Sequence, residues 1–344
     1  MKLLKIVLAL TLGLLLIAGV FAGGGGQKAE PGKAPAAAPT KFTIGGTNGP
    51  SDTQSMGHYD YAKRLNALGG WNADAKVSSE LGGTDDMTEQ AMNGAPICTS
   101  SDPSRIAVYV PDVGILNMPY VFSDYSQVDK LLDTAIYKEW VQKLKGKGVM
   151  LLTTGITGWR NWVTNKPIKT PADLNGLKIR TMGNPIAINS VKAMGALPIA
   201  MPQDQAYHAI STKVVDGGEW QLPTIYSLKL YEVAKNISLS HHFLLLLSMV
   251  TGTKFMDTLS PEQQKQVVDV AVATYNDNKK LVIEKENGFL TEMESKFGVV
   301  VERNPDLKAF QQSTVSLFSD KATTGDADFH AIRTELFKQL GIAQ

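Results

Sequence analysis

Short apolar runs alternate with segments of helical period along the chain from Lys41 onward. This alternation is typical of an α/β fold, in which strands and helices follow one another. The predicted strands cover 41–44, 75–78, 96–99, 149–153, 159–164, 177–181, 198–201 and 244–251. The predicted helices between them include 55–68, 86–92, 125–132 and 136–145. We therefore expect β-sheets flanked by helices.

Two helix starts carry strong capping signals. Thr170-Pro-Ala-Asp and Ser260-Pro-Glu-Gln each combine a hydroxyl at the N-cap, a proline at the first helical position and a third side chain that can reach back. After the second start, apolar side chains keep a helical spacing from Pro261 to Phe297, interrupted at Gly288. A helix of this length is too long for one ordinary domain, so we expect it to span two lobes.

The amino terminus has the layout of a secretory signal peptide. Lys2 and Lys5 precede an apolar stretch that closes on small residues at Ala22. The alternative is a permanent membrane anchor, because the apolar stretch approaches the roughly 20 residues that span a bilayer. No cysteine lies near Gly23, which argues against a lipid anchor. We expect a cleavable signal over 1–22, a flexible Gly/Ala/Pro-rich linker over 23–40, and export to the periplasm.

Composition narrows the classes of protein further. The 344 residues are 43% apolar and 19% charged, which excludes a disordered, collagen-like or polytopic membrane protein and fits about two domains. The net charge of +1 provides no overall basic field for nucleic acid, so a charged partner must be recognised at a local site. The single cysteine, Cys98, excludes an internal disulfide and a zinc site built from several thiolates.

Motifs of common enzymes are missing from the sequence, which has no GxSxG, HExxH, Walker-type or GxGxxG pattern. His241 and His242 would point to opposite faces of a strand, so they do not form a metal pair. Asp326 and Asp328 with His330 have the spacing of a metal clip, but they precede an apolar-periodic segment and are better explained as acids at a helix start. We expect no metal site.

Two arginines near strand ends are the strongest candidates for chemistry. In the strand-like stretch 158–164, alternation places Arg160 and Trp162 on the face opposite Trp159 and Asn161. Arg180 ends a short strand before a glycine and a proline. A guanidinium group fits a carboxylate with two parallel hydrogen bonds, so neighbouring arginines would form an anion site. The alternative is that each arginine pairs with an internal Asp or Glu or lies on the surface.

The segment 214–220 ends in two glycines followed by Glu219 and Trp220. The glycines would let backbone approach a ligand, with Trp220 as a stacking wall. The segment alone favours the other interpretation, a strand that ends in a turn with a core tryptophan.

Taken in order, the segments of the chain after Lys41 resemble the DctP-type solute-binding proteins of tripartite ATP-independent periplasmic (TRAP) transporters. The matching segments are Leu81-Gly82, 113–122, Gly158-Trp-Arg-Asn, 167–174, 176–180, Ala193-Met-Gly-Ala, 206–210, 214–217, 231–235 and 259–262. The resemblance implies a two-lobed α/β periplasmic binding protein, type II-like, with a β-sheet in each lobe and a long helix spanning both. It places lobe I at 41–157 plus 246–285 and lobe II at 158–245 plus 286–344.

The resemblance also implies ligand-binding residues. Arg180 matches the arginine that clamps the ligand carboxylate, and Arg160 matches a second arginine. Asp102 falls at the position of a ligand-facing acid, Gln203 at a wall position, and Asn48 in the loop after the first strand. Trp220 and Trp159 complete the expected pocket, with Glu219 beside them.

One departure from the family pattern concerns the ligand. Many members carry Gln-Glu-Asn-Pro after the Val-Asp-Gly segment, whereas this chain has Gly218-Glu219-Trp220-Gln221. Loss of that amide weakens the expectation of a sialic acid or sugar acid, and Glu-Trp is similar to members that bind keto acids. Trp220 with Trp159 would suit a compact, planar or partly apolar carboxylate. The resemblance implies no cofactor and leaves open a cation that accompanies the ligand.

We therefore expect a non-catalytic, monomeric protein that captures a small organic acid with an arginine clamp between two lobes and delivers it to TRAP permease subunits in the membrane. One alternative is a ligand receptor for an ATP-driven importer or a sensor kinase. Another is an exported enzyme acting on a carboxylic acid, for which Asp102, Glu219 and His242 are the candidate catalytic groups.

Overall fold

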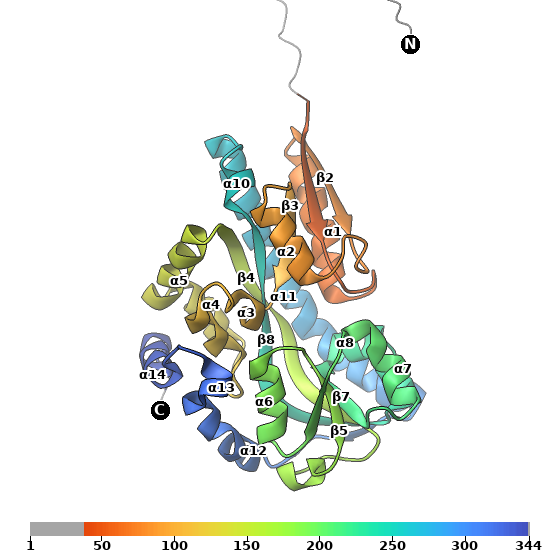
Figure 1. Cartoon of the computed structure of the whole chain (residues 1–344). Helices are drawn as coiled ribbons and strands as arrows, with labels where there is room; N and C mark the ends of the chain where they lie inside the picture. Colours follow the sequence, from red (N-terminus) through yellow and green to blue (C-terminus); the bar gives the residue numbers. More distant parts are fainter. Residues whose placement is uncertain (1–37, 343–344) are drawn as a thin grey trace, which may run out of the picture. The chain divides into compact units, whose positions relative to one another are not determined.

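A computed structural model describes residues 38–342 of the chain (Figure 1). The predicted signal peptide and residues 23–37 of the predicted linker lie outside the described residues. The strands are β1 (Thr40–Gly45), β2 (Trp71–Lys76), β3 (Ile97–Ser101), β4 (Val149–Thr164), β5 (Lys178–Thr181), β6 (Leu197–Ala200), β7 (Gly217–Gln221), β8 (Asn236–Gly252) and β9 (Val300–Glu302).

The helices are α1 (Thr53–Ala67), α2 (Thr84–Met92), α3 (Pro103–Ile106), α4 (Ser126–Asp133), α5 (Ala135–Gly146), α6 (Pro185–Ala193), α7 (Ala206–Ser211), α8 (Leu222–Ser227), α9 (Leu230–Val233), α10 (Thr253–Met256), α11 (Pro261–Phe297), α12 (Leu307–Thr314), α13 (Lys321–Thr324) and α14 (Phe329–Leu340). Short 3₁₀ segments are η1 (Pro111–Asn117), η2 (Pro171–Leu174), η3 (Gln203–Gln205) and η4 (Val315–Ser319).

The strands form one mixed sheet in the order β2-β1-β3-β8-β4-β7-β5-β6, with β9 beside β8. The outer strands β2, β1 and β3 are parallel to one another at one end, and β7, β5 and β6 are parallel at the other. The two long antiparallel strands β4 and β8 connect these ends (Figure 1). The sheets of the two lobes are therefore joined through β4 and β8.

Each end of the sheet has its own apolar core. Phe42 and Ile44 of β1 pack with Leu65 of α1 and Val267 of α11 in the first lobe. Ile210, Trp220 and Leu290 belong to a second core around β7, α7 and the C-terminal half of α11, and Trp162 and Ile179 to a third beneath β5. The two ends of the sheet thus have separate cores and share the strands β4 and β8, which is the predicted two-lobed α/β fold class.

The long helix α11 packs along both lobes. Its start is fixed by the predicted capping box, in which Ser260 accepts from the Gln263 amide and the Gln263 side chain accepts from the Ser260 amide. The Tyr61 hydroxyl donates to the Val267 carbonyl at 2.7 Å near one end, and Met293 is buried in the second lobe near the other. The predicted helix over 261–297 is confirmed with both boundaries.

A further apolar cluster joins segments that the sequence assigns to different lobes. Helices α4 and α5 pack with α14 and with the middle of β4 and β8 (Figure 1). Trp140 and Leu144 of α5 share this cluster with Phe329 and Leu336 of α14. The lobe boundaries at 157/158, 245/246 and 285/286 stay predictions.

Four predicted strands have clearly different bounds in the structure. The runs 149–153 and 159–164 are one strand, β4, whose pairing with β8 shifts register at three points and so interrupts the apolar pattern. Strand β2 covers Trp71–Lys76 instead of 75–78, because Ser78 and Ser79 have positive φ values and belong to a turn. Strand β8 begins at Asn236, eight residues before the predicted 244.

The two glycines at the start of strand β7, Gly217 and Gly218, are required by close packing. A Cβ on Gly217 would lie 2.2 Å from the Val163 carbonyl oxygen, and one on Gly218 would lie 2.3 Å from the Trp220 ring. Both glycines therefore allow β7 to pack closely, and the chain continues in extended form through Glu219 and Trp220 to Gln221. The predicted turn at the glycines is wrong, and the core position of Trp220 is confirmed.

Within residues 38–342, no helix combines the length and apolar character needed to cross a bilayer.

Candidate ligand-binding cleft

A cavity of about 670 Å³ lies between the two lobes. Asn48, Asp102 and Arg105 line it from the first lobe, and Arg180 and Gln203 line it from the second. The strands β4 and β8 contribute Thr157, Arg160, Leu245 and Leu247 to its lining. Most of the side chains that line the cavity carry amides, hydroxyls or charges, so the cavity suits a polar, hydrogen-bonding ligand.

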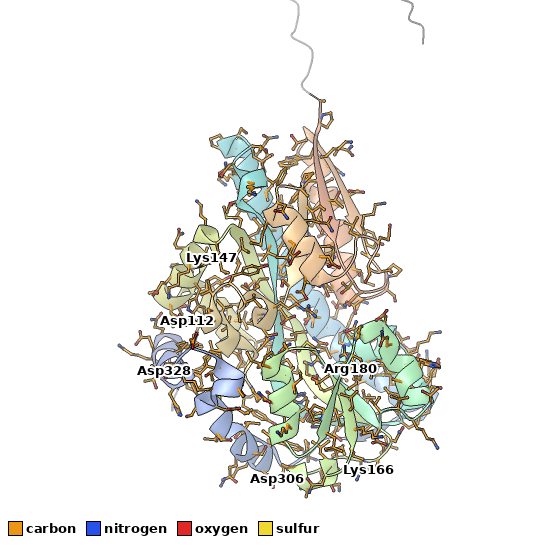
Figure 2. All side chains as sticks on the ribbon, viewed as in Figure 1. Asp112, Lys147, Lys166, Arg180, Asp306 and Asp328 are labelled. Carbon is orange, nitrogen blue, oxygen red and sulfur yellow. The ribbon has the colours of Figure 1, made fainter. Side chains whose placement is uncertain are left out.

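Arg180 lines the cavity from β5, one residue before that strand ends at Thr181. Figure 2 labels it in the part of the molecule that contains β5, β7 and α8. Its side chain is only 3% exposed, and its Nε donates to the Met201 carbonyl at 3.1 Å. The guanidinium lies 5.0 Å from the centroid of the Trp220 ring, so the indole supports it from one side.

No carboxylate within residues 38–342 forms an ion pair with Arg180. Burial and the nearby charge of Arg160 lower the pKa of Arg180 to about 10. A guanidinium with this pKa is still ionised at neutral pH, so a nearly buried positive charge faces the cavity without an internal counter-ion. An anionic ligand would supply that counter-ion.

Arg160 is in a different state, because it pairs with Glu219. The Arg160 Nε donates to the Glu219 side chain, and Nη2 donates to the Glu219 carbonyl oxygen. The Thr181 hydroxyl donates to the other carboxylate oxygen at 3.0 Å. Burial raises the pKa of Glu219, but the charge of Arg160 and a contact with His242 outweigh it and lower that pKa well below its usual range. Arg160 therefore lines the cavity as half of a buried ion pair, the alternative that the sequence left open.

Glu219 and His242 lie behind the cavity lining. The His242 Nε2 lies 3.5 Å from Glu219, and its Nδ1 lies 2.8 Å from the Ser240 hydroxyl. Burial lowers the pKa of His242, which keeps the ring neutral. His241 is exposed on the other side of β8, as the alternation predicts. The two groups named as possible catalysts are thus fixed in a buried network outside the cavity.

Asp102 lines the cavity as the N-cap of α3. Its carboxylate accepts from the Ser104 amide at 3.1 Å, from the Asn117 side chain at 3.1 Å and from the Arg105 Nε at 2.9 Å. These contacts occupy the oxygens that a general acid or base would need free, so the position of Asp102 does not favour a catalytic role either. Asp328 is likewise an N-cap, accepting from the Ala331 amide, which confirms the helix-start explanation.

Asn48 and Gln203 meet across the cleft. The Gln203 side-chain amide donates to the Asn48 Oδ1 at 3.0 Å. Close by, the Asp52 carboxylate accepts from the Gln54 amide at 2.9 Å in its own lobe and from the Thr224 and Ser227 hydroxyls at 3.3 Å in the other. These hydrogen bonds hold the two lobes in contact beside the cavity.

The structure does not place the two tryptophans on the cavity wall. Trp220 is fully buried in the core of the second lobe and contacts Arg180 from behind. The Trp159 ring packs at a tilt against Tyr125 and His241, with ring centroids 5.6 and 5.7 Å away, and it belongs to the apolar cluster of α4, α5 and α14. The expected stacking walls are therefore corrected to supporting core residues, and the inference of a partly apolar ligand loses its basis.

Several lining residues carried no sequence signal of their own. Arg105, Gln221, Asp52 and Thr224 line the cavity because turns and helix starts from distant parts of the chain converge there. Arg105 could have been found from Asp102, because residues three apart at a helix start lie on one face. Within residues 38–342, no group of three or more His, Cys, Asp or Glu side chains is arranged to hold a metal ion.

Glu286 is a half-buried acid on α11. The Tyr125 hydroxyl donates to its Oε2 at 2.6 Å, and a Cβ on Gly158 would lie 2.5 Å from its Oε1. The carboxylate thus packs into the register shift of β4, where Gly158 has a φ of 119°. Burial raises the pKa of Glu286 from 4.5 to about 7, against smaller lowering effects of Tyr125 and Trp159.

We predict that this acid makes the protein less stable as the pH rises. Folding raises the pKa, so the folded state binds the extra proton and its stability falls between about pH 4.5 and pH 7. Between pH 5.5 and pH 8 the free energy of unfolding should fall by about 2 kcal/mol from this group. Urea unfolding should show this fall in the wild type and not in Glu286→Gln, which keeps an acceptor for Tyr125. Glu284→Gln, on an exposed part of the same helix, is the control and should show the same fall in the free energy of unfolding as the wild type. An equal fall in the two variants would contradict the prediction.

Comparison with known proteins identifies the family. Residues 48–323 match the model of bacterial extracellular solute-binding protein, family 7, and the chain belongs to this DctP family. It is 37% identical over 245 residues to the 2,3-diketo-L-gulonate-binding periplasmic protein YiaO of Escherichia coli strain K12, covering 70% of each chain. Its relatives are solute-binding proteins and not enzymes.

Solved structures agree with this assignment. A TRAP periplasmic solute-binding protein from Ochrobacterium anthropi with bound L-fuconate is 30% identical and has a TM-score of 0.81, covering 87% of this chain and 100% of that one. Another from Actinobacillus succinogenes 130z with bound L-galactonate is 28% identical with a TM-score of 0.79, covering 87% and 100%. The predicted family and the two-lobed fold class are confirmed.

Proposed function

We propose that this protein captures a hydroxylated monocarboxylate, such as a six-carbon sugar acid, and delivers it to the membrane subunits of a TRAP transporter. The observation that carries the proposal is Arg180: a buried cation that faces a cavity and has no carboxylate partner within residues 38–342. A ligand carboxylate would bind its guanidinium with two parallel hydrogen bonds.

The rest of the cavity supports a ligand rich in hydroxyl groups. Asn48, Gln203 and Gln221 offer amides, and Thr157 and Thr224 offer hydroxyls, from both lobes. The three relatives compared above bind L-fuconate, L-galactonate and 2,3-diketo-L-gulonate. Each of these ligands has one carboxylate and several oxygens along the carbon chain. A hydroxylated acid therefore fits better than the compact, partly apolar acid expected from Trp220.

Binding would couple to closure because the cavity lies between the lobes. The ligand would favour the closed arrangement to the extent that it binds that arrangement more tightly than the open one. The contacts from Gln203 to Asn48 and from Thr224 to Asp52 are available to hold the closed lobes. Presentation to a permease, and export of the chain by its predicted signal peptide, belong to the same proposal.

A matched pair of compounds tests the proposed function. L-galactonate and galactitol differ in whether the first carbon is a carboxylate or an alcohol. At about one hundred times its dissociation constant, a bound acid adds about 2.7 kcal/mol to stability and should raise the melting temperature clearly. We expect a rise with L-galactonate, L-fuconate or 2,3-diketo-L-gulonate and none with galactitol. Equal shifts with galactitol, or no shift with any hydroxylated acid in a broad panel, would contradict the proposal.

A further inference from the structure

The three arginines of the cavity differ in how their charges are balanced. Arg180 has no carboxylate partner within residues 38–342, and Arg160 has one, Glu219. Arg105, on α3, has two: its Nε donates to Asp102 at 2.9 Å, and its Nη1 pairs with Asp85. Arg105 lines the cavity and is 34% exposed, so its position alone would make it a second anchor for an anion. The Asp85 and Asp102 carboxylates instead already pair with its guanidinium group.

The cavity that Arg105 lines is acidic overall. Asp52, Asp85, Asp86, Asp102 and Asp204 all line the cavity. With Arg105 paired to two acids and Arg160 paired to Glu219, Arg180 carries the positive charge that is left for a ligand. A second anionic group on the ligand would meet like charges instead of a free cation, which is unfavourable in a partly desolvated site.

We propose that the Asp85–Arg105–Asp102 group restricts the cleft to ligands with a single anionic group, and that Asp85 is the residue that determines this specificity. The inference rests on the proposed function and deepens it. A sugar acid with one carboxylate at Arg180 would place hydroxyl groups toward the aspartates, which accept hydrogen bonds from them. A dicarboxylate of the same length would place its second carboxylate there and be rejected.

Asp85 is the member of the group whose charge can be removed without breaking the fold. Its side chain is 68% exposed and, among the hydrogen bonds of residues 38–342, it pairs with Arg105. The capping box of α2 uses its neighbour Asp86, whose carboxylate accepts from the Gly83 amide at 2.9 Å. Asp102, by contrast, caps α3 and holds Asn117, so its substitution would disturb the backbone.

The experiment compares L-galactonate with galactarate, which differ in whether the sixth carbon is an alcohol or a carboxylate. Isothermal titration of the wild type should give an affinity for L-galactonate at least about 30-fold above that for galactarate. In Asp85→Asn, the Arg105 guanidinium loses one of its two carboxylate partners and can donate a charge-assisted hydrogen bond to the second carboxylate of galactarate. The affinity for galactarate should therefore rise at least about tenfold. The affinity for L-galactonate should not rise, because Asp85→Asn replaces a charged acceptor for its hydroxyl groups by a neutral one.

Asp204→Asn is the matched control. It removes the same formal charge from the cavity lining, but among the ion pairs and hydrogen bonds of residues 38–342 none joins Asp204 to Arg105. Galactarate affinity should change less than about threefold in this variant, since one exposed charge without a direct partner contributes little. An equal gain in Asp204→Asn would overturn the role of Arg105, and an unchanged galactarate affinity in a folded Asp85→Asn would overturn the role of Asp85.

The two proposals fail in distinguishable ways. A wild type that binds galactarate as tightly as L-galactonate overturns the single-anion rule and leaves the proposed function standing. If L-galactonate is not bound, gluconate and glucarate provide the same comparison. A wild type that binds no acid of either kind overturns the proposed function and the inference together.

Discussion

Replacing Arg180 by methionine should abolish binding of the acid while making the ligand-free protein more stable. The side chain would lose two charge-assisted hydrogen bonds to the carboxylate, each worth about 1.5–3 kcal/mol, so affinity should fall at least about 100-fold. Without ligand, Arg180 is a nearly buried charge beside Arg160 with no acid of its own in residues 38–342. Its removal should raise the free energy of unfolding by about 1–2 kcal/mol.

The opposite signs of these two effects make the prediction specific. Titration calorimetry measures the loss of affinity, and urea unfolding without ligand measures the gain in stability. Arg180→Lys is the matched variant, because it keeps the charge and loses the planar fork; it should weaken binding about tenfold or more and show less gain in stability. If Arg180→Met lowered stability and left affinity unchanged, Arg180 would have a structural role instead of a ligand-binding one.

Replacing Glu219 by glutamine should destabilise the protein strongly. Glu219 is fully buried and neutralises Arg160, so its loss leaves two uncompensated guanidinium groups side by side. Breaking a buried ion pair by removing one partner costs about 3–5 kcal/mol, and urea unfolding should show a loss of this size.

A double variant separates the charge effect from packing. In Arg160→Met combined with Glu219→Gln, no unpaired charge remains at this pair, so much of the lost stability should return. A double variant less stable than the sum of the two single variants would show that the ion pair is not the source of the effect. The same double variant keeps Arg180, which allows its ligand affinity to be measured separately.

The elements that the sequence predicted best are those with local signals. Helix α11 matches over its full 37 residues because Ser260 and Gln263 form the capping box at one end and Gly298 adopts the left-handed conformation at the other. Arg180 was found because it ends a predicted strand before a glycine and a proline, and strand ends are where side chains reach a cleft in α/β folds. Both features lie within a few neighbouring residues.

Charge partners could not be predicted in this way. Glu219 is 59 positions from Arg160, and the two meet because β4 and β7 are antiparallel neighbours with Arg160 opposite Gln221. A shift of one residue in that register would turn Glu219 to the other face of the sheet. Which of the two arginines stays free for a ligand is therefore decided by strand pairing, and the sequence left both alternatives open.

The expected position of the two tryptophans on the cavity wall differs from the structure for a related reason. The segment around Trp220 alone favoured a core position, and the family resemblance added the role of a ligand wall; the direction of the side chain depends on the register of β7. The structure buries Trp220 beneath Arg180, where it supports the guanidinium instead of the ligand. Arg105 was overlooked because α3 is one short turn, too short to show a periodic pattern.

A crystal structure of the protein with the most tightly bound acid of the panel would test most directly whether a ligand supplies the missing counter-ion of Arg180. We expect both oxygens of the ligand carboxylate within about 2.7–3.2 Å of the Arg180 guanidinium nitrogens, with Arg160 still paired to Glu219. A carboxylate bound elsewhere in the cavity, or Arg180 turned to pair with one of the protein's own aspartates, would contradict it.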